Sequence, residues 1–412
     1  MVRVQANRGA GKGQALQALQ DGRLTLRGKG RSLAGKEQKL TRIILPPRIV
    51  LTLCLTVLLA CAPRGVMTLA PEAGAVGTIS PIFVGTTRAV ENGSFGAGRS
   101  ESVRFARFDI SIPPQRKLGE INWPSRMGKP DPKRHFLTTA AQVYPSAPTF
   151  RRDLAADLAA HNGEAVIFVH GYNNNFSEGL YRVAQFAHDL DLPGTVVHYA
   201  WPSAAEPLGY VYDRDSAIFA RDGLESLMEE VAAAGATKIL LVAHSMGAAL
   251  TMESLRQAAI RGNSRALPNL SGVILISPDI DVDVFRAQAH AIGNLPQPFV
   301  IFGSDRDRIL RISAGLTGQA VRLGSLPDVS RVADLQVTFL DVGQFSTGAG
   351  HFTVGDSAAL ILLLERIGEV EGAFEKDRAL RVGLVPGVVM TVQNATQIVL
   401  SPVAKVSTGL GK

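Results

Sequence analysis

The sequence predicts an α/β protein with a mainly parallel central sheet and helices on both of its faces. Six strand-like runs alternate with helical stretches between residues 165 and 340, which is the order that a parallel sheet with crossover helices requires. The runs are short and rich in β-branched and aliphatic residues, as strands buried on both faces are. With 412 residues the chain is long enough for one large domain of this class.

Strand-like and helix-like segments follow one another in a regular order. Two strands come first, at 81–87 and, with alternating apolar residues, at 102–112. The core strands are expected at 165–170, 195–200, 239–243, 273–277, 299–302 and 335–340. The intervening helices are expected at 180–190, 216–234, 248–261 and 282–291.

The connections leave little room for a second domain. Only about 20 residues separate Ser277 from Pro298, which is too few for a large cap domain. The Pro-rich residues 113–150 are expected to run over the surface. Any lid would come from that segment or from residues 203–214.

Ser245 occupies the junction between a buried strand and a helix. Residues 239–243 are apolar and strand-like, whereas 246–259 have helical composition. A serine on such a sharp turn projects its hydroxyl from the sheet, and small flanking residues are needed because strand and helix cross closely there. Gly247 supplies one small residue, and Ala243 stands where the usual motif has glycine. This context predicts a nucleophilic serine.

The positive charge of the chain is confined to its N-terminal segment. The formal net charge is +7. Of the 43 Lys and Arg residues, 11 lie in residues 1–50 with 2 of the 36 Asp and Glu residues, so 32 basic and 34 acidic residues remain beyond it. A nucleic-acid partner is therefore not expected.

Residues 1–60 are expected to be a basic leader followed by a signal peptide. The uncharged run 49–60 has the length of a signal-peptide core, not of a membrane span. It ends in Leu58-Leu59-Ala60-Cys61, which resembles the lipobox of bacterial lipoproteins. The leader is unusually long, and one hypothesis is that translation begins near Leu40, so that residues 1–39 are not translated; the intact mass of the precursor tests this.

The lipobox resemblance implies that Cys61 is acylated and becomes the mature N-terminus. It further implies a membrane-anchored lipoprotein of the cell envelope that faces the periplasm, in the outer membrane because Ala62 is not the aspartate that signals inner-membrane retention. The only other cysteine, Cys54, lies in the removed segment. A mature domain with no free thiol and no disulfide excludes cysteine catalysis and a Cys-based metal site.

The rest of the chain divides into a tether, a domain and a tail. Residues 61–80 are rich in Pro, Gly and Ala and are expected to form a lipid-anchored tether. Residues 81–376 are expected to form the α/β domain. Residues 377–412, in which 382–404 carry no charge but several polar residues, are expected to form a weakly structured tail that is packed on the domain or disordered.

Five segments together resemble a bacterial family of esterase/lipase-like α/β hydrolases of poorly defined function. They are Phe83-Val-Gly-Thr-Thr-Arg88, Val169-His-Gly-Tyr-Asn-Asn174, Ala200-Trp-Pro-Ser203, Ala243-His-Ser-Met-Gly247 and Ser277-Pro-Asp-Ile-Asp281. The resemblance covers residues 80 to 375 and implies the α/β-hydrolase fold. The combination is specific, whereas no single segment is.

A serine hydrolase of this fold needs a histidine base late in the chain, after the nucleophile and the acid. Of the eight histidines, only His290 and His351 follow Ser245. His290 lies inside an expected helix, before the best candidate for the acid. His351 lies in a Gly-rich segment just after the last expected strand, and we assign the base to it.

The acid is expected after the strand 299–302, where Asp305 and Asp307 are both available. Asp307 fits the pattern of Asp-x-Ile-aliphatic at the start of a helix, and Asp305 does not. Either residue could instead cap that helix. Asp279 and Asp281 are the next alternatives, with helix capping as their preferred role.

Two backbone N–H groups must stabilise the oxyanion. The first is expected from Met246, the residue after the nucleophile, and the second from Tyr172. Gly171 would let the backbone approach the substrate, and Asn173 would hold the loop through a side-chain bond. Trp201, after another strand, is expected either to line the acyl pocket or to pack in the core. His170 and His244 are expected to orient the loops.

These residues predict a serine hydrolase that cleaves a small acyl ester through an acyl-enzyme, with no metal or organic cofactor. Two alternatives stay open, namely an acyltransferase that uses the same triad and a non-catalytic envelope protein that keeps the scaffold for binding. The sequence leaves the acyl chain, the leaving group and the oligomeric state undefined.

Overall fold

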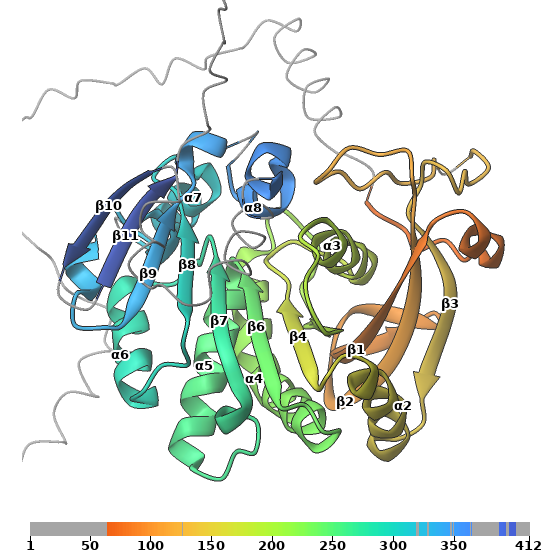
Figure 1. Cartoon of the computed structure of the whole chain (residues 1–412), viewed down its shortest axis with the longest axis horizontal. Helices are drawn as coiled ribbons and strands as arrows, with labels where there is room; N and C mark the ends of the chain where they lie inside the picture. The colour runs from red at the N-terminus through yellow and green to blue at the C-terminus, as the bar shows by residue number, and fades with distance from the viewer. Residues whose placement is uncertain are drawn as a thin grey trace, which may run out of the picture. The chain divides into compact units, whose positions relative to one another are not determined.

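One sheet of eleven strands runs through the part of the chain that the structure describes. The computed structural model describes residues 64–125, 127–318, 321–327, 329–346, 348, 350–362, 364, 387–392 and 395–400. The strands are ordered β10-β11-β9-β8-β7-β6-β4-β5-β1-β2-β3 (Figure 1). From β11 to β1 every neighbouring pair is parallel, so the predicted mainly parallel sheet is confirmed.

The central strands coincide with the expected core strands to within a few residues. They are β4 (Glu164–Val169), β5 (Thr195–Ala200), β6 (Lys238–His244), β7 (Leu270–Ile276), β8 (Phe299–Gly303) and β9 (Val337–Asp341). In β4 five of six residues are buried, and β6 is buried at Ile239 and from Leu241 to Ala243, as expected for parallel strands covered on both faces.

An antiparallel extension continues the sheet beyond β5. It consists of β1 (Thr78–Glu91), β2 (Ser94–Ile112) and β3 (Leu137–Tyr144), with β2 paired to both of the others. The first two strands are longer than expected. The third strand lies in the segment that was predicted to run over the surface. Its residues 140–143 are all exposed, so this strand lacks the alternation of buried and exposed residues by which a strand is predicted.

Helices cover both faces of the sheet (Figure 1). One face packs against α2 (Ala147–Ala160), α4 (Tyr210–Ala233), α5 (Met246–Arg261) and α6 (Val282–Ile292). The other packs against α3 (Phe176–Asp189) and α8 (Thr353–Asp356). Successive residues of a strand serve opposite faces, so Ile167 and Leu241 belong to the first core and Phe168 and Val242 to the second.

The remaining described helices are short. They are α7 (Arg308–Leu316) and the 3₁₀ helices η1 (Pro71–Ala75), η2 (Leu267–Asn269), η3 (Leu323–Ser325), η4 (Val329–Val332) and η5 (Gly343–Phe345). Between β7 and β8 the chain forms only α6. The described residues therefore hold no cap domain at that connection, as predicted.

The segment before β1 lies against the domain and does not form the loose tether expected over residues 61–80. Ala70 N–H donates to Thr138 O at 2.8 Å, and Thr138 N–H donates to Thr68 O at 2.9 Å. Met67 N–H donates to the Ser177 hydroxyl at 3.1 Å. A composition rich in Pro, Gly and Ala disfavours regular structure but does not prevent backbone groups from bonding to neighbours. The first residue of this segment that the structure describes is Arg64.

The C-terminal segment contributes two strands where a weakly structured tail was expected. They are β10 (Gly387–Val392) and β11 (Ala395–Leu400), and β11 pairs in parallel with β9. Both segments are rich in Val, Ile and Thr, residues that favour strands. After α8, residues 358–362 and 364 are helical in the described part of the chain, in a stretch whose amphipathic pattern predicts a helix over 354–370. Cys61 and the leader lie outside the described residues.

Among the described residues, none of the helices combines the length and the hydropathy that a membrane span requires.

Candidate active site

Ser245 sits on a strained turn between β6 and α5. Its φ of 54° and ψ of −122° place a non-glycine residue in a rarely populated region of backbone space. The turn is held on both sides, because Ser245 N–H donates to Ile276 O at 2.9 Å and Asp279 N–H donates to Ser245 O at 3.2 Å. The Ser245 side chain is buried. This is the geometry that the strand–serine–helix pattern predicted.

The helix α5 crosses β4 at a distance that only glycine permits. A Cβ atom at Gly247 would lie 2.7 Å from the carbonyl oxygen of Val169 and still closer to that of His170. Gly247, the small residue that the sequence predicted after the nucleophile, is therefore required because a side chain there would clash with the backbone at the end of β4. Ala243, on the other side, is fully buried.

His351 connects Ser245 to a buried carboxylate. Its Nε2 atom lies 2.8 Å from Ser245 Oγ, and its Nδ1 atom lies 2.8 Å from Asp307 Oδ2. A carboxylate accepts and does not donate, so Nδ1 carries the proton and Nε2 is left to accept the serine proton. The side chain of Asp307 is fully buried, whereas that of His351 is 15% exposed.

Asp307 also begins α7. Its Oδ1 atom accepts hydrogen bonds from the N–H groups of Ile309 and Leu310, both at 3.0 Å. Capping and contact with His351 are thus made by different oxygens of one carboxylate, and the two roles that the sequence analysis weighed against each other coexist. The cap also fixes the orientation of the carboxylate toward His351.

The other carboxylates considered for the acid have different partners. Asp279 lies 3.0 Å from the Arg322 guanidinium and accepts a hydrogen bond from Tyr210 Oη at 2.9 Å. Asp281 caps α6, and Asp305 is exposed. Of the four candidates, only Asp307 has a hydrogen bond to His351 in the described structure.

The loop between β4 and α3 (residues 170–175, the β4–α3 loop) packs against the nucleophile. A Cβ atom at Gly171 would lie 2.9 Å from Ser245 Cβ and 2.6 Å from His244 Nδ1. The side-chain amide of Asn174 donates to the carbonyl oxygens of Gly171 and Tyr172 at 3.1 and 2.9 Å. The glycine therefore permits the close backbone approach that the sequence predicted, and Asn174 stabilises the turn.

Buried polar groups tie the β4–α3 loop to its neighbours. Asp213 accepts from Asn173 N–H at 3.1 Å, and Ser203 Oγ accepts from Asn174 N–H at 3.1 Å. Ser203 in turn donates to Asp213 at 2.6 Å. These contacts connect the loop to the segment after β5 and to α4.

Arg88 is a buried cation under this loop that the sequence analysis did not single out. Its guanidinium donates to the carbonyl oxygens of Asn174, Ser203 and Gly96 at 2.8, 3.1 and 2.9 Å. Burial lowers the pKa of Arg88 to about 10, still well above neutral pH. The sequence feature that could have identified Arg88 is its position at the end of the segment Phe83-Val-Gly-Thr-Thr-Arg88.

Trp201 is a residue of the hydrophobic core. It is fully buried, its indole N–H donates to His170 O at 2.7 Å, and its ring stacks on that of His170 at 4.9 Å. Of the two roles weighed from the sequence, packing is the one that the structure supports. The contact places Trp201 behind the β4–α3 loop.

His244 supports the loop that bears His351. Its Nε2 atom lies 3.2 Å from the carbonyl oxygen of His351, and the two rings are 4.7 Å apart. Burial, followed by the nearby His351 ring, holds the pKa of His244 well below its ordinary value. His244 is therefore neutral at physiological pH and can donate one hydrogen bond to that carbonyl.

Acid is expected to destabilise the domain through its buried histidines, and His198 permits a direct test. Burial lowers the pKa of His198 from 6.5 to about 3. Between these values the unfolded state binds more protons, so stability falls as the pH drops below 6.5. For this one group the loss between pH 7 and pH 5 is about 2 kcal/mol. Urea denaturation at pH 7 and pH 5 measures how much free energy of unfolding is lost between the two pH values. In His198→Asn this loss should be smaller than in wild type by about 2 kcal/mol. Equal losses in the two proteins would contradict the lowered pKa of His198.

Fold and site together define the class of protein as an α/β hydrolase. Residues 146–364 match a family model described as "Alpha/beta hydrolase of unknown function (DUF900)". The match covers more than half of the 412 residues, and the chain belongs to this family. No curated protein matches the chain.

Several solved structures are similar to the domain at low identity. An esterase of Pyrococcus furiosus is 11% identical over 76% of this chain and 99% of its own, with a TM-score of 0.35. Carboxyl esterase 2 of Tuber melanosporum is 10% identical over 78% of this chain and 96% of its own, with a TM-score of 0.35. Esterase B of Lactobacillus rhamnosis is 15% identical over 52% of this chain and 80% of its own, with a TM-score of 0.30.

Proposed function

We propose that this protein is a serine hydrolase that cleaves carboxylic esters through an acyl-enzyme. One observation supports the proposal most directly, namely the continuous hydrogen-bonded series Ser245–His351–Asp307 with 2.8 Å at each contact. A serine whose hydroxyl is bonded to a histidine, itself oriented by a buried carboxylate, is the arrangement of an activated nucleophile.

In the proposed reaction, Ser245 Oγ attacks the acyl carbonyl while His351 Nε2 accepts its proton. Asp307 stabilises the imidazolium that forms. His351 then gives the proton to the leaving-group oxygen as the tetrahedral intermediate collapses to the acyl-enzyme. Water, deprotonated by the same histidine, attacks the ester and releases the acid. All of these proton transfers use side chains of this chain, so the scheme calls for no cofactor.

The oxyanion is assigned to the N–H groups of Met246 and Tyr172. Met246 is the first residue of α5, whose N-terminal N–H groups and dipole favour negative charge. Tyr172 follows Gly171, where an added Cβ atom would lie only 2.9 Å from Ser245 Cβ, so the backbone of this loop passes close to the nucleophile. Each such donor is worth about 10²–10³ in rate.

Labelling of the full-length chain with a fluorophosphonate tests the proposal. The expected result is one adduct, mapped by peptide mass spectrometry to Ser245 and absent from Ser245→Ala and His351→Ala. Unlabelled wild-type chain would then be given a panel of acyl esters, with and without an alcohol acceptor, to separate hydrolysis from acyl transfer. Absence of the adduct in folded wild-type chain would reject an activated serine and favour a binding role.

We further propose that acylation of Cys61 anchors the protein in the bacterial cell envelope. The support is the Leu-Leu-Ala-Cys sequence at the end of the uncharged run. Cys61→Ala is expected to move the protein from the membrane to the soluble fraction and to remove the mass of the acyl groups. A variant that stays membrane-bound with an unchanged mass would show that another segment is the anchor.

A further inference from the structure

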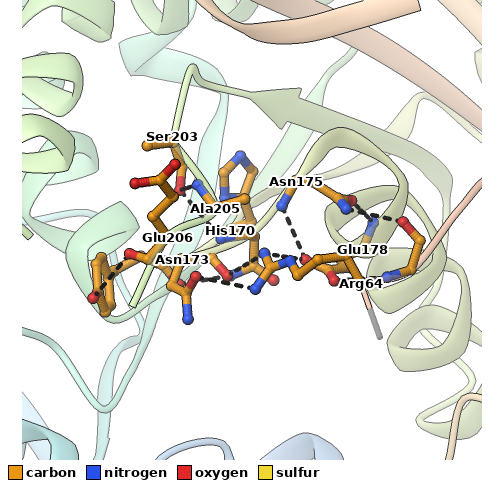
Figure 2. Close-up of polar contacts among 12 residues, drawn as sticks. Arg64, His170, Asn173, Asn175, Glu178, Ser203, Ala205 and Glu206 are labelled. Atoms are coloured by element: carbon orange, nitrogen blue, oxygen red, sulfur yellow. Dashed lines mark hydrogen bonds and ion pairs between the residues drawn. The ribbon is translucent and has the colours of Figure 1, made fainter. Parts of the chain in front are cut away.

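The guanidinium of Arg64 donates several hydrogen bonds to the β4–α3 loop, although the loop lies more than 100 residues further along the sequence. Its guanidinium donates to Asn173 Oδ1 at 3.1 Å and to the Asn173 carbonyl oxygen at 2.9 Å. A third contact, at 2.6 Å, is an ion pair with Glu178. Figure 2 shows these three residues together, with Arg64 reaching the loop from the side of α3. One side chain thus holds both the backbone and the side chain of Asn173.

The backbone around Arg64 is fixed to the same elements. Gly65 N–H donates to Glu178 Oε1 at 2.9 Å, and the Asn175 side-chain amide donates to Gly65 O at 2.9 Å. Glu178 and Asn175 are the two members of the capping box that begins α3. We call residues 64–70 the N-terminal strap. The strap is bonded to the point where the β4–α3 loop enters its helix.

Asn173 is the residue of this loop whose conformation most needs support. Its φ of +59° lies in the left-handed region, which asparagine adopts more readily than most residues but less readily than glycine. It follows Tyr172, the residue to which we assign an oxyanion donor. A shift of the Asn173 backbone would therefore move the peptide groups next to that donor.

We propose that Arg64 is a positioning residue for the oxyanion hole, acting through Asn173. The inference rests on the proposed function for its catalytic consequence, and on the contacts above for its structural part. An arginine suits the role, because its planar fork can donate to two acceptors on one residue, whereas a lysine ammonium is a point charge without that geometry.

Arg64→Ala is expected to lower kcat by about 10- to 100-fold and to leave KM nearly unchanged. The oxyanion contact is made in the transition state and not in the ground state, so its loss appears in kcat. A misplacement of about 1 Å can by itself cost about 100-fold. Arg64→Lys should recover only part of the activity, since it restores the charge but not the fork.

Arg331→Ala is the matched control. It removes another arginine–carboxylate pair, with Asp283 at 2.8 Å, from the exposed surface. Activity and melting temperature should stay at wild-type values. Comparable losses of kcat in Arg64→Ala and Arg331→Ala would show a general effect of removing surface charge, and would overturn the proposal.

Hydrogen–deuterium exchange provides a readout that does not require turnover. In full-length Arg64→Ala, amides 171–175 should exchange at least about 10-fold faster than in wild type, with core strands unchanged. Unchanged exchange at 171–175 overturns the positioning role, whatever the activity. Faster exchange with unchanged kcat in an active enzyme also overturns it. If the wild type has no esterase activity, the proposed function fails, while exchange still decides whether Arg64 holds the loop.

Discussion

Ser245→Ala is expected to lower kcat by about 10⁶-fold while the protein stays folded. In the proposed mechanism the variant lacks the atom that would form the acyl-enzyme, so only the binding site and the assigned oxyanion donors would remain to accelerate direct attack by water. Ser245 is buried on a turn held by backbone hydrogen bonds to Ile276 and Asp279. Because its hydroxyl bonds only to His351 among the described contacts, removal of that hydroxyl should leave the melting temperature almost unchanged.

Combining Ser245→Ala with His351→Ala tests whether the two residues act in one catalytic step or contribute independently to the rate. His351→Ala should cost about as much as Ser245→Ala, and the double variant should be no slower than either, because residues that act in one step are strongly non-additive. Initial rates of ester hydrolysis over a wide range of enzyme concentration would measure this. If the two losses multiply in the double variant, the two residues act separately and the proposed mechanism is wrong.

Asp307→Asn is expected to lower kcat by about 10⁴-fold with little loss of stability. The amide oxygen of asparagine can still cap α7, where Asp307 Oδ1 accepts from Ile309 and Leu310. The amide nitrogen, however, would donate to His351 Nδ1, and the imidazole would then carry its proton on Nε2. In that tautomer His351 cannot accept the serine proton, which is the cause of the expected loss.

Two further variants distinguish the roles of this carboxylate. Asp307→Ala removes the cap as well, and should add a loss of about 1 kcal/mol in unfolding free energy to the loss of activity. Asp305→Asn, two residues away on the exposed surface, should change neither. A loss of activity in Asp305→Asn equal to that in Asp307→Asn would contradict the assignment of the acid.

The elements that the sequence predicted best are those whose pattern has one physical cause. Apolar runs of five residues mark β4 and β6 because both faces of these strands are covered. The glycine after Ser245 is required because α5 crosses β4 there. At these positions the sequence pattern and the packing requirement indicate the same structure. The arrangement around Ser245 could therefore be predicted without coordinates.

The elements that the sequence did not predict depend on contacts between distant segments. Nothing local marks Arg64 as a loop support, and the segment that ends in Arg88 does not show what Arg88 contacts, since each arginine reaches residues more than 80 positions away. The strand β3 has too many exposed residues to show an alternating pattern. Trp201 could equally have faced a ligand, and only its stacking on His170 shows that it is packed.

Because the N-terminal strap is bonded to the domain, it limits the distance between the domain and a membrane in which Cys61 would be anchored. Only Ala62 and Pro63 separate Cys61 from Arg64, and three peptide steps span at most about 11 Å. If Cys61 carries the lipid, the side of the enzyme that bears the β4–α3 loop stays within about a nanometre of the bilayer surface. An ester that partitions into that bilayer would then reach the site by lateral diffusion in the membrane plane, and its turnover would depend on its density per unit area of lipid.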